Sequence, residues 1–201
     1  MKVIGLCGGS GSGKGSVCNL FASYGIPSID TDAIYHEMTS CDSECVRALS
    51  EEFGEEIIST DGALNRKALR AIVFCGKDAE HRLKRLNEIS HKFILDEVRT
   101  RLKLYSDQGV KAAIVDAPVL FESGFDSECD YIIAVKAPKE IRINRIMLRD
   151  GIDRQSALSR IDSQLPDEWI VSHSHYVIEN DSDLISLKNK VAKAAELILN
   201  I

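Results

Sequence analysis

The chain has 201 residues, of which 44% are hydrophobic and 28% charged, and its formal net charge is −6. These proportions are typical of a globular protein with one sizeable α/β core, and the acidic balance argues against a nucleic-acid partner, which would favour a basic domain. The six cysteines form no C-x-x-C pair, so neither a zinc ribbon nor a redox motif is indicated. With no leader-like start and no apolar run of membrane-spanning length, we expect a cytoplasmic protein without a membrane partner.

A glycine-rich segment at residues 8–16, with the sequence GGSGSGKGS, organises the chain. The apolar run at residues 3–7 predicts a buried strand before it, and a helical apolar spacing begins after it at Val17. A glycine loop between a strand and a helix is typical of a P-loop, where backbone N–H groups surround phosphate and Lys14 supplies a cation. The predicted ATP-binding residues of this loop are Gly11, Ser12, Gly13, Lys14, Gly15 and Ser16.

One position departs from the usual P-loop pattern. Gly15 stands where such loops carry the Ser or Thr that ligates Mg²⁺, and the next hydroxyl belongs to Ser16. Because the cofactor Mg²⁺ then lacks a side-chain ligand from the loop, we expect ATP and water to hold it. Asp116, at the end of another apolar strand, is predicted to lie in its outer shell through water.

A second short strand at residues 26–29 ends in Asp30, Thr31 and Asp32. Ligands bind at the carboxyl ends of strands in open α/β sheets, so we interpret at least one of the two carboxylates as catalytic. Thr31 or Asp32 is also placed to cap a helix that starts at Ala33, and capping does not exclude catalysis.

Residues 42–105 are predicted to be mostly helical, which interrupts the alternation of strands and helices. Asn65 resembles an N-cap, and a long amphipathic helix begins near Ala79. Its apolar stripe consists of Leu83, Leu86, Ile94, Val98 and Leu102. Such an insertion between core strands favours a substrate-binding subdomain or a lid.

The remaining elements complete the sheet. Strands are predicted at residues 112–116, 131–135 and 175–178, and a last helix at residues 184–199, capped by Asp181 or Ser182. A run of arginines follows the fourth strand, at Arg142, Arg145, Arg149, Arg154 and Arg160. The first three share one helix face, and guanidinium groups bind phosphate oxygens well, which favours a phosphate-clamping lid over a solvated basic face.

Together these elements predict an α/β fold, a P-loop kinase of three α/β/α layers with a five-stranded parallel sheet. The whole chain is expected to form one such domain. Its core would be about residues 1–31, 110–138 and 172–201, its helical substrate-binding insertion about 32–109, and its small helical lid about 139–171.

The chain resembles the dephospho-coenzyme A kinase family over nearly its whole length. The most specific matches are the Asp30–Asp32 pair and the segment DAPVLFE at residues 116–122. Further matches are residues 8–14, Phe53-Gly54, DGALNRKAL at 61–69, Val73-Phe74, LNEISH at 86–91, Arg145, RDG at 149–151, Arg160 and Gln164. The chain departs from the family at Lys92, where a proline is usual.

The resemblance implies the last step of coenzyme A synthesis, in which ATP phosphorylates the ribose 3′-hydroxyl of dephospho-CoA. It implies that Asp32 orients this hydroxyl and accepts its proton, and that Asp30 supports it or holds a water bound to magnesium. Lys14, Arg145 and Arg149 are then expected to stabilise the transferring phosphate. His91 and Leu120 are expected to contact the substrate, and Asn180 to lie near adenine.

Two alternatives remain at this point. Another small-molecule P-loop kinase, such as a nucleoside monophosphate kinase, is favoured by the glycine after Lys14, and a regulatory ATPase would bind nucleotide without phosphorylating a small molecule. ATP and dephospho-CoA are the expected partners of a monomer or weak oligomer.

Overall fold

The computed structural model describes residues 1–200, which divide into two compact units. The first unit comprises Met1–Asp30 and the chain from Leu102 onward, and the second comprises Thr31–Arg101. The assignment of functional roles to a core, an insertion and a lid remains a prediction.

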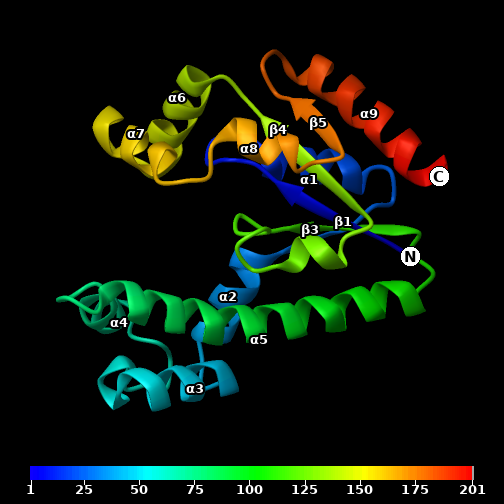
Figure 1. Cartoon of the computed structure of the whole chain (residues 1–201). Coiled ribbons are helices and arrows are strands. Elements are labelled where there is room, and N and C mark those ends of the chain that lie inside the picture. The colour runs from blue at the N-terminus through cyan, green and yellow to red at the C-terminus, as the bar shows by residue number, and fades with distance from the viewer. Residues whose placement is uncertain (201) are drawn as a thin grey trace. The chain divides into compact units, whose positions relative to one another are not determined.

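The first unit is built on a parallel five-stranded sheet in the order β2-β3-β1-β4-β5 (Figure 1). Its strands are β1 Lys2–Cys7, β2 Ser28–Asp30, β3 Ala112–Asp116, β4 Tyr131–Lys136 and β5 Tyr176–Glu179. The sheet confirms the predicted α/β class, and β3 has the predicted bounds. Because every strand is parallel, all five carboxyl ends lie at one edge, which is where an open α/β sheet binds ligands.

Two helices, α1 (Lys14–Ala22) and α9 (Leu184–Asn200), pack against this sheet. Phe21 of α1 and Val191 of α9 are fully buried in one apolar cluster with strand residues such as Ile4. The N-cap of α9 differs from the prediction, because the Ser186 N–H donates to Asp183 Oδ1 at 2.8 Å. Leu184, the first residue of α9, is 58% exposed, so the buried face of this helix begins further along.

The segment after β4 forms three helices, α6 Lys139–Asp150, α7 Arg154–Asp162 and α8 Asp167–Ser172. Gly151 has φ +64° and ends α6, and Asp153 caps α7 by accepting from the Ser156 N–H. Helices α6 and α7 share a small apolar cluster of Ile143, Ile146, Ala157 and Ile161. A short 3₁₀ helix, η2 (Phe125–Glu128), precedes β4.

The second unit is helical. It contains α2 Thr31–Thr39, α3 Glu44–Phe53, the 3₁₀ turn η1 Glu55–Ile57, α4 Arg66–Val73 and most of α5 Ala79–Asp107. Asn65 caps α4 as predicted, since its side chain accepts from the Ala68 N–H at 3.1 Å. The core of the unit consists of Cys45, Val46, Leu49, Phe53, Ile57, Leu64, Leu69 and Val73. Leu83, which we placed in the apolar stripe of α5, is 36% exposed.

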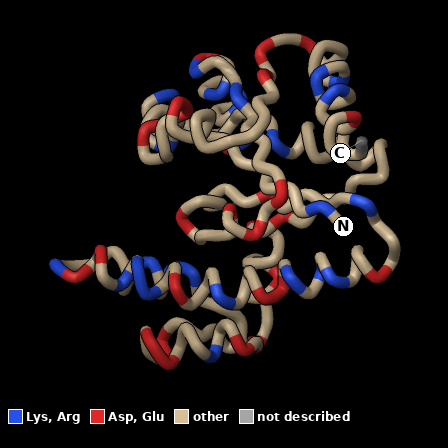
Figure 2. The backbone as a smooth tube through the Cα atoms, turned by 45° about the vertical axis from the view of Figure 1, so that its right-hand side comes forward, with Lys and Arg blue, Asp and Glu red and all other residues tan. Residues whose placement is uncertain are grey.

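Helix α5 carries both charge signs along its length (Figure 2). Pairs such as Lys84–Glu88 and Lys103–Asp107 are spaced four residues apart, which stabilises a helix modestly. Among residues 1–200, no helix is both long and apolar enough to cross a bilayer.

Candidate functional site

The glycine-rich loop has a backbone that only glycine adopts easily. Gly8, Gly11 and Gly13 have φ values of +142°, +78° and +97°. A Cβ atom at Gly8 would collide with the carbonyl oxygen of Val135, and one at Gly13 would collide with the amide nitrogen of Asn180. The glycines at these positions are therefore required both by backbone conformation and by close neighbours.

The carbonyl groups of the loop are held from one side by side-chain donors. Arg145 Nη1 donates to the carbonyls of Gly11 and Ser12, each at 3.2 Å, and Asn180 Nδ2 donates to Ser12 at 2.8 Å. Arg142 Nε donates to the Ser10 carbonyl at 2.8 Å. Because the C=O and N–H of a trans peptide point in opposite directions, these bonds turn the N–H groups of the following residues away from the donors.

Helix α1 continues this arrangement, because it begins at Lys14 without a side-chain cap at Gly13. The first N–H groups of an α-helix have no acceptor within the helix, and the helix dipole is positive there. The first turn of α1 also contains no acidic residue. Loop and helix together therefore form a surface of backbone donors that suits phosphate oxygens.

Two carboxylates lie beside the loop lysine at the carboxyl edge of the sheet. Lys14 Nζ donates to the Gly8 carbonyl at 3.1 Å and lies 3.9 Å from Asp116 Oδ1. Asp30 on β2 is in register with Asp116 on β3, so the two carboxylates end neighbouring strands. The register thus brings Lys14, Asp30 and Asp116 to one edge, as their positions after strands predict.

This edge also fits a hydrated magnesium ion. Carboxylate oxygens are the ligands that Mg²⁺ prefers, and the ion usually keeps several waters and phosphate oxygens. Among the described residues, no group of three or more His, Cys, Asp or Glu side chains could hold a metal, so a carboxylate pair is what the protein offers. Gly15, where the usual hydroxyl is missing, has no atom within 4 Å of an added Cβ.

The thiol of Cys18 lies close to Asp116 and is not ionised at neutral pH. Cys18 Sγ lies 3.8 Å from Asp116 Oδ2. Burial, together with the negative charge of Asp116, raises the pKa of Cys18 to about 12. The thiol therefore stays protonated at neutral pH and serves as a packing group with a weak donor.

The three arginines predicted to share one face separate in the structure. Arg142 is buried, and its Nη1 donates to both carboxylate oxygens of Asp167 at 2.8 Å. Its Nη2 also donates to Gln164 Oε1 at 3.2 Å. Gln164 Oε1 also accepts from the Ser10 N–H at 2.8 Å. Arg142 and Gln164 therefore connect the chain after β4 to the glycine loop. We expected Arg142 to belong to a phosphate-clamping lid, whereas in the structure it is buried and donates to the Ser10 carbonyl.

Arg149 does not reach the loop in this conformation. Its side chain is 60% exposed and bonds Asp150 at 2.7 Å and 2.9 Å, and Arg160 bonds the same carboxylate. These arginines hold the pKa of the Asp150 carboxyl below its usual range. Arg145 is thus the one of the two predicted lid arginines that contacts the phosphate loop here, and the catalytic role of Arg149 remains a prediction.

The other predicted site residues are distributed as follows. Helix α2 begins at Thr31, so Asp32 lies within its first turn and does not precede the helix as predicted. His91 is half-buried in α5. Leu120 is fully buried, and a methyl carbon of its side chain would lie 2.8 Å from a Cβ at Gly5. Leu120 is therefore a core residue in this conformation, which does not support the substrate contact expected for it.

Asn180 bonds the phosphate loop itself. It is buried and donates to the Ser12 carbonyl, and its Oδ1 accepts a hydrogen bond from Arg145 Nη2 at 3.4 Å. Whether it also contacts adenine, as the resemblance implies, remains a prediction.

Comparisons with known proteins agree with this geometry. A sequence model described as dephospho-CoA kinase matches residues 2–186. A dephospho-CoA kinase of Corynebacterium glutamicum is 39% identical over 94% of this chain and 95% of its own length. One from Syntrophotalea carbinolica is 35% identical over 95% of this chain and 89% of its own length.

Solved structures give the same fold. A Thermus thermophilus protein superposes with a TM-score of 0.82 at 29% identity, over 98% of this chain and 97% of its own. A shikimate kinase from Acinetobacter baumannii superposes with a TM-score of 0.57 at 15% identity, over 100% of this chain and 94% of its own, which shows likeness of fold alone. The family model and the sequence relatives are thus dephospho-CoA kinases, and the solved structures show the shared fold.

Proposed function

Since the chain belongs to the dephospho-CoA kinase family, we propose how its own residues transfer the γ-phosphate of ATP to the ribose 3′-hydroxyl of dephospho-CoA. The products are ADP and coenzyme A, which makes this the last step of coenzyme A biosynthesis. The observation that carries the assignment of roles is the anchoring of the loop carbonyls by Arg145 and Asn180, because it orients backbone donors toward an anion.

On the ATP side, the N–H groups of residues 11–16 bind the phosphates and Lys14 balances charge on the β- and γ-phosphate oxygens. Asn180 keeps the loop in shape through the Ser12 carbonyl. Arg145, on α6, contacts the carbonyls of Gly11 and Ser12, and its proposed role is to stabilise charge on the transferring group. Arg149 would join it only after exchanging Asp150 for a phosphate oxygen, which requires a movement of the lid helices.

On the acceptor side, Asp32 orients the 3′-hydroxyl and accepts its proton, with Asp30 in support. A carboxylate is a weak base, but a loose phosphoryl-transfer transition state depends mainly on positioning and charge stabilisation. His91 contributes to the substrate-binding surface of the helical insertion. In this proposal, the ATP phosphates bind at the loop between β1 and α1, and the base that accepts the proton lies in the first turn of α2.

Mg²⁺ bound with ATP would withdraw charge from the phosphate oxygens. Asp116 and Asp30 are the side chains proposed to hold its water shell, because their strands are in register beside Lys14. Ser16, one residue beyond Gly15, is proposed to reach an α-phosphate oxygen instead of replacing the missing ligand.

The setting of the enzyme follows from the same assignment. We expect a cytoplasmic monomer or weak oligomer that acts on ATP and dephospho-CoA, without nucleic acid or membrane as a partner.

A coupled assay of ADP release tests the proposal. We expect turnover with dephospho-CoA and none with AMP, CMP or UMP, and we expect the product to carry its new phosphate on the 3′-hydroxyl. Lys14→Ala, purified in parallel, controls for a contaminating kinase. Turnover of a nucleoside monophosphate in place of dephospho-CoA would contradict the proposal.

A further inference from the structure

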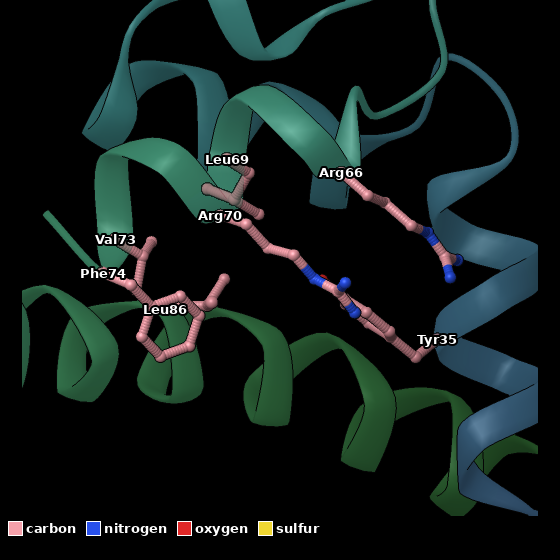
Figure 3. A pocket seen from close by; sticks show the side chains of 7 residues that line it. All are labelled: Tyr35, Arg66, Leu69, Arg70, Val73, Phe74 and Leu86. Carbon is pink, nitrogen blue, oxygen red and sulfur yellow. The ribbon is translucent and has the colours of Figure 1, made fainter. Parts of the chain in front are cut away.

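Arg142 differs from every other charged residue that the structure describes, because it is the only one that is buried. Two arginines of the second unit show the usual situation. Arg66 and Arg70 are exposed and line a cavity of about 150 Å³ beside α4 (Figure 3). An exposed guanidinium keeps its charge in contact with water, whereas a buried one needs a counter-charge and acceptors for its N–H groups. The surroundings of Arg142 have to supply both.

The counter-charge of Arg142 comes from Asp167. Arg142 Nη1 donates to both carboxylate oxygens of Asp167, each at 2.8 Å, and the Asp167 side chain is only 27% exposed. Asp167 is the first residue of α8. Trp169, on the same helix, packs edge-on against Phe121 with the ring centroids 4.9 Å apart, which connects α8 to the segment after β3. The carboxylate thus extends from a helix that is itself held by packing.

The glycine loop lies directly against Arg142. A Cβ atom at Gly9 would collide with Arg142 Nη2, and one at Gly11 would lie 2.7 Å from the Arg142 carbonyl oxygen. Arg142 Nε donates to the carbonyl of Ser10, which lies between these two glycines, at 2.8 Å. Side chains at residues 9 and 11 are incompatible with this position of Arg142, so the two glycines allow the close approach of loop and arginine.

Hydrogen bonds hold both peptide groups that flank Ser10. In the preceding peptide, the Ser10 N–H donates to Gln164 Oε1 at 2.8 Å. In the following peptide, the Ser10 carbonyl accepts from Arg142, and because C=O and N–H of a trans peptide point in opposite directions, the Gly11 N–H points away from Arg142. Arg142 thereby sets the direction of the first N–H group that we assign to the ATP phosphates.

We propose that Asp167 is a positioning residue for ATP. Its charge holds the buried guanidinium of Arg142 against the Ser10 carbonyl, and this contact directs the Gly11 N–H toward the phosphates. The inference rests on the proposed function, because it assigns that N–H group to ATP. Asp167 does not touch the nucleotide in this proposal, so its removal acts through Arg142 and the loop.

Calorimetric titration with the non-hydrolysable analogue β,γ-imido-ATP and Mg²⁺, without an acceptor, tests the proposal. Asp167→Asn keeps the shape of the side chain but removes its charge, which leaves a buried guanidinium without a counter-charge. We expect the Kd for the analogue to rise about tenfold, the scale of one hydrogen bond to a charged group. Asp167→Glu keeps the charge, and its Kd should stay within about threefold of wild type.

A double variant separates positioning from stability. Arg142→Met combined with Asp167→Asn buries no charge, so its Tm should lie close to that of wild type, whereas Asp167→Asn alone should unfold at a lower temperature. Because the Ser10 carbonyl still lacks its donor, the double variant should bind the analogue about as weakly as Asp167→Asn. As a matched control, Asp162→Asn removes an exposed carboxylate that pairs with Lys139, and its Kd should equal that of wild type.

Two results would overturn the proposal. One is a Kd within about twofold of wild type in folded Asp167→Asn, and the other is a double variant that recovers the wild-type Kd together with the Tm. If Asp167→Asn does not fold, the double variant alone decides.

The kinetics separate this proposal from the function itself. Asp167→Asn should raise the KM for ATP about tenfold and leave the KM for dephospho-CoA within about twofold of wild type. Wild-type protein that binds the analogue but does not turn over dephospho-CoA would refute the proposed function, and the Kd values of the variants would still decide on Asp167.

Discussion

Arginines contact the glycine loop of the first unit and also line a cavity of the second, yet they meet different groups in the two places. Arg142 and Arg145 bind carbonyl oxygens of the loop, and the ligand is proposed to meet backbone N–H groups instead of these arginines. Arg66 and Arg70 line the cavity themselves. The comparison shows that the acceptors within reach of an arginine decide whether it shapes the backbone or lines a cavity.

Asp32→Asn should give the largest effect, and it tests whether acceptor chemistry lies outside the loop. Because the change removes the proton acceptor and almost no volume, we expect kcat to fall by about 10²–10⁴-fold. The Kd for ATP, measured by fluorescence titration, should stay unchanged. A kcat within a few-fold of wild type would mean that Asp32 is not the base.

Lys14→Ala should give the next largest loss, and it tests the loop itself. Removing a preorganised charge beside the transferring phosphate should lower kcat by about 10²–10³-fold. Pre-steady-state phosphate transfer measures the chemical step directly. An equal loss in Kd for ATP and none in kcat would show that Lys14 binds the ground state only.

Two arginine variants test whether each arginine holds the loop backbone or binds the phosphate. Arg145→Ala removes two hydrogen bonds to the loop and should weaken ATP binding about tenfold. Arg149→Ala should leave the Kd for ATP unchanged and lower kcat about tenfold, because its proposed contact forms only after lid closure. Weaker ATP binding in Arg149→Ala would show that this arginine also reaches the loop before catalysis.

Gly15→Ser should have the smallest effect. An added Cβ meets no atom within 4 Å, and Gly15 does not have the positive φ of Gly11 and Gly13, so the loop should keep its shape. If Mg²⁺ is held by ATP and water, its affinity and kcat should remain within about twofold, as measured by Mg²⁺ titration of the rate. A large gain would mean that the missing hydroxyl limits the natural enzyme.

Local signals in the sequence were enough for several features. The apolar run ending in Asp116 predicted β3, and Asn65 was identified as an N-cap because one suitable residue directly precedes a helical pattern. The cap of α9 was assigned wrongly, because Asp181, Ser182 and Asp183 are all suitable and propensity does not choose among them. Sequence patterns thus succeed where one candidate stands alone and fail where neighbours compete.

In the candidate site too, sequence patterns did not predict which residues meet when they are far apart in the chain. Spacing placed Arg142, Arg145 and Arg149 on one helix face, but only packing showed which of them meets a carbonyl and which meets Asp150. Leu120 belonged to a family-like segment, yet the absence of a side chain at Gly5 lets it fill the core.

By itself, the sequence determined the phosphate loop, the parallel α/β class and the family, because glycine positions, apolar periods and capping residues act within a few residues of one another. Only the tertiary structure decided that Asp30 and Asp116 are in register and that Arg145 and Asn180 hold the loop carbonyls. It also brought Tyr35, Arg66 and Arg70 around one cavity. These contacts join residues far apart in the chain, and their geometry is set by the packing of whole elements, which no local pattern encodes.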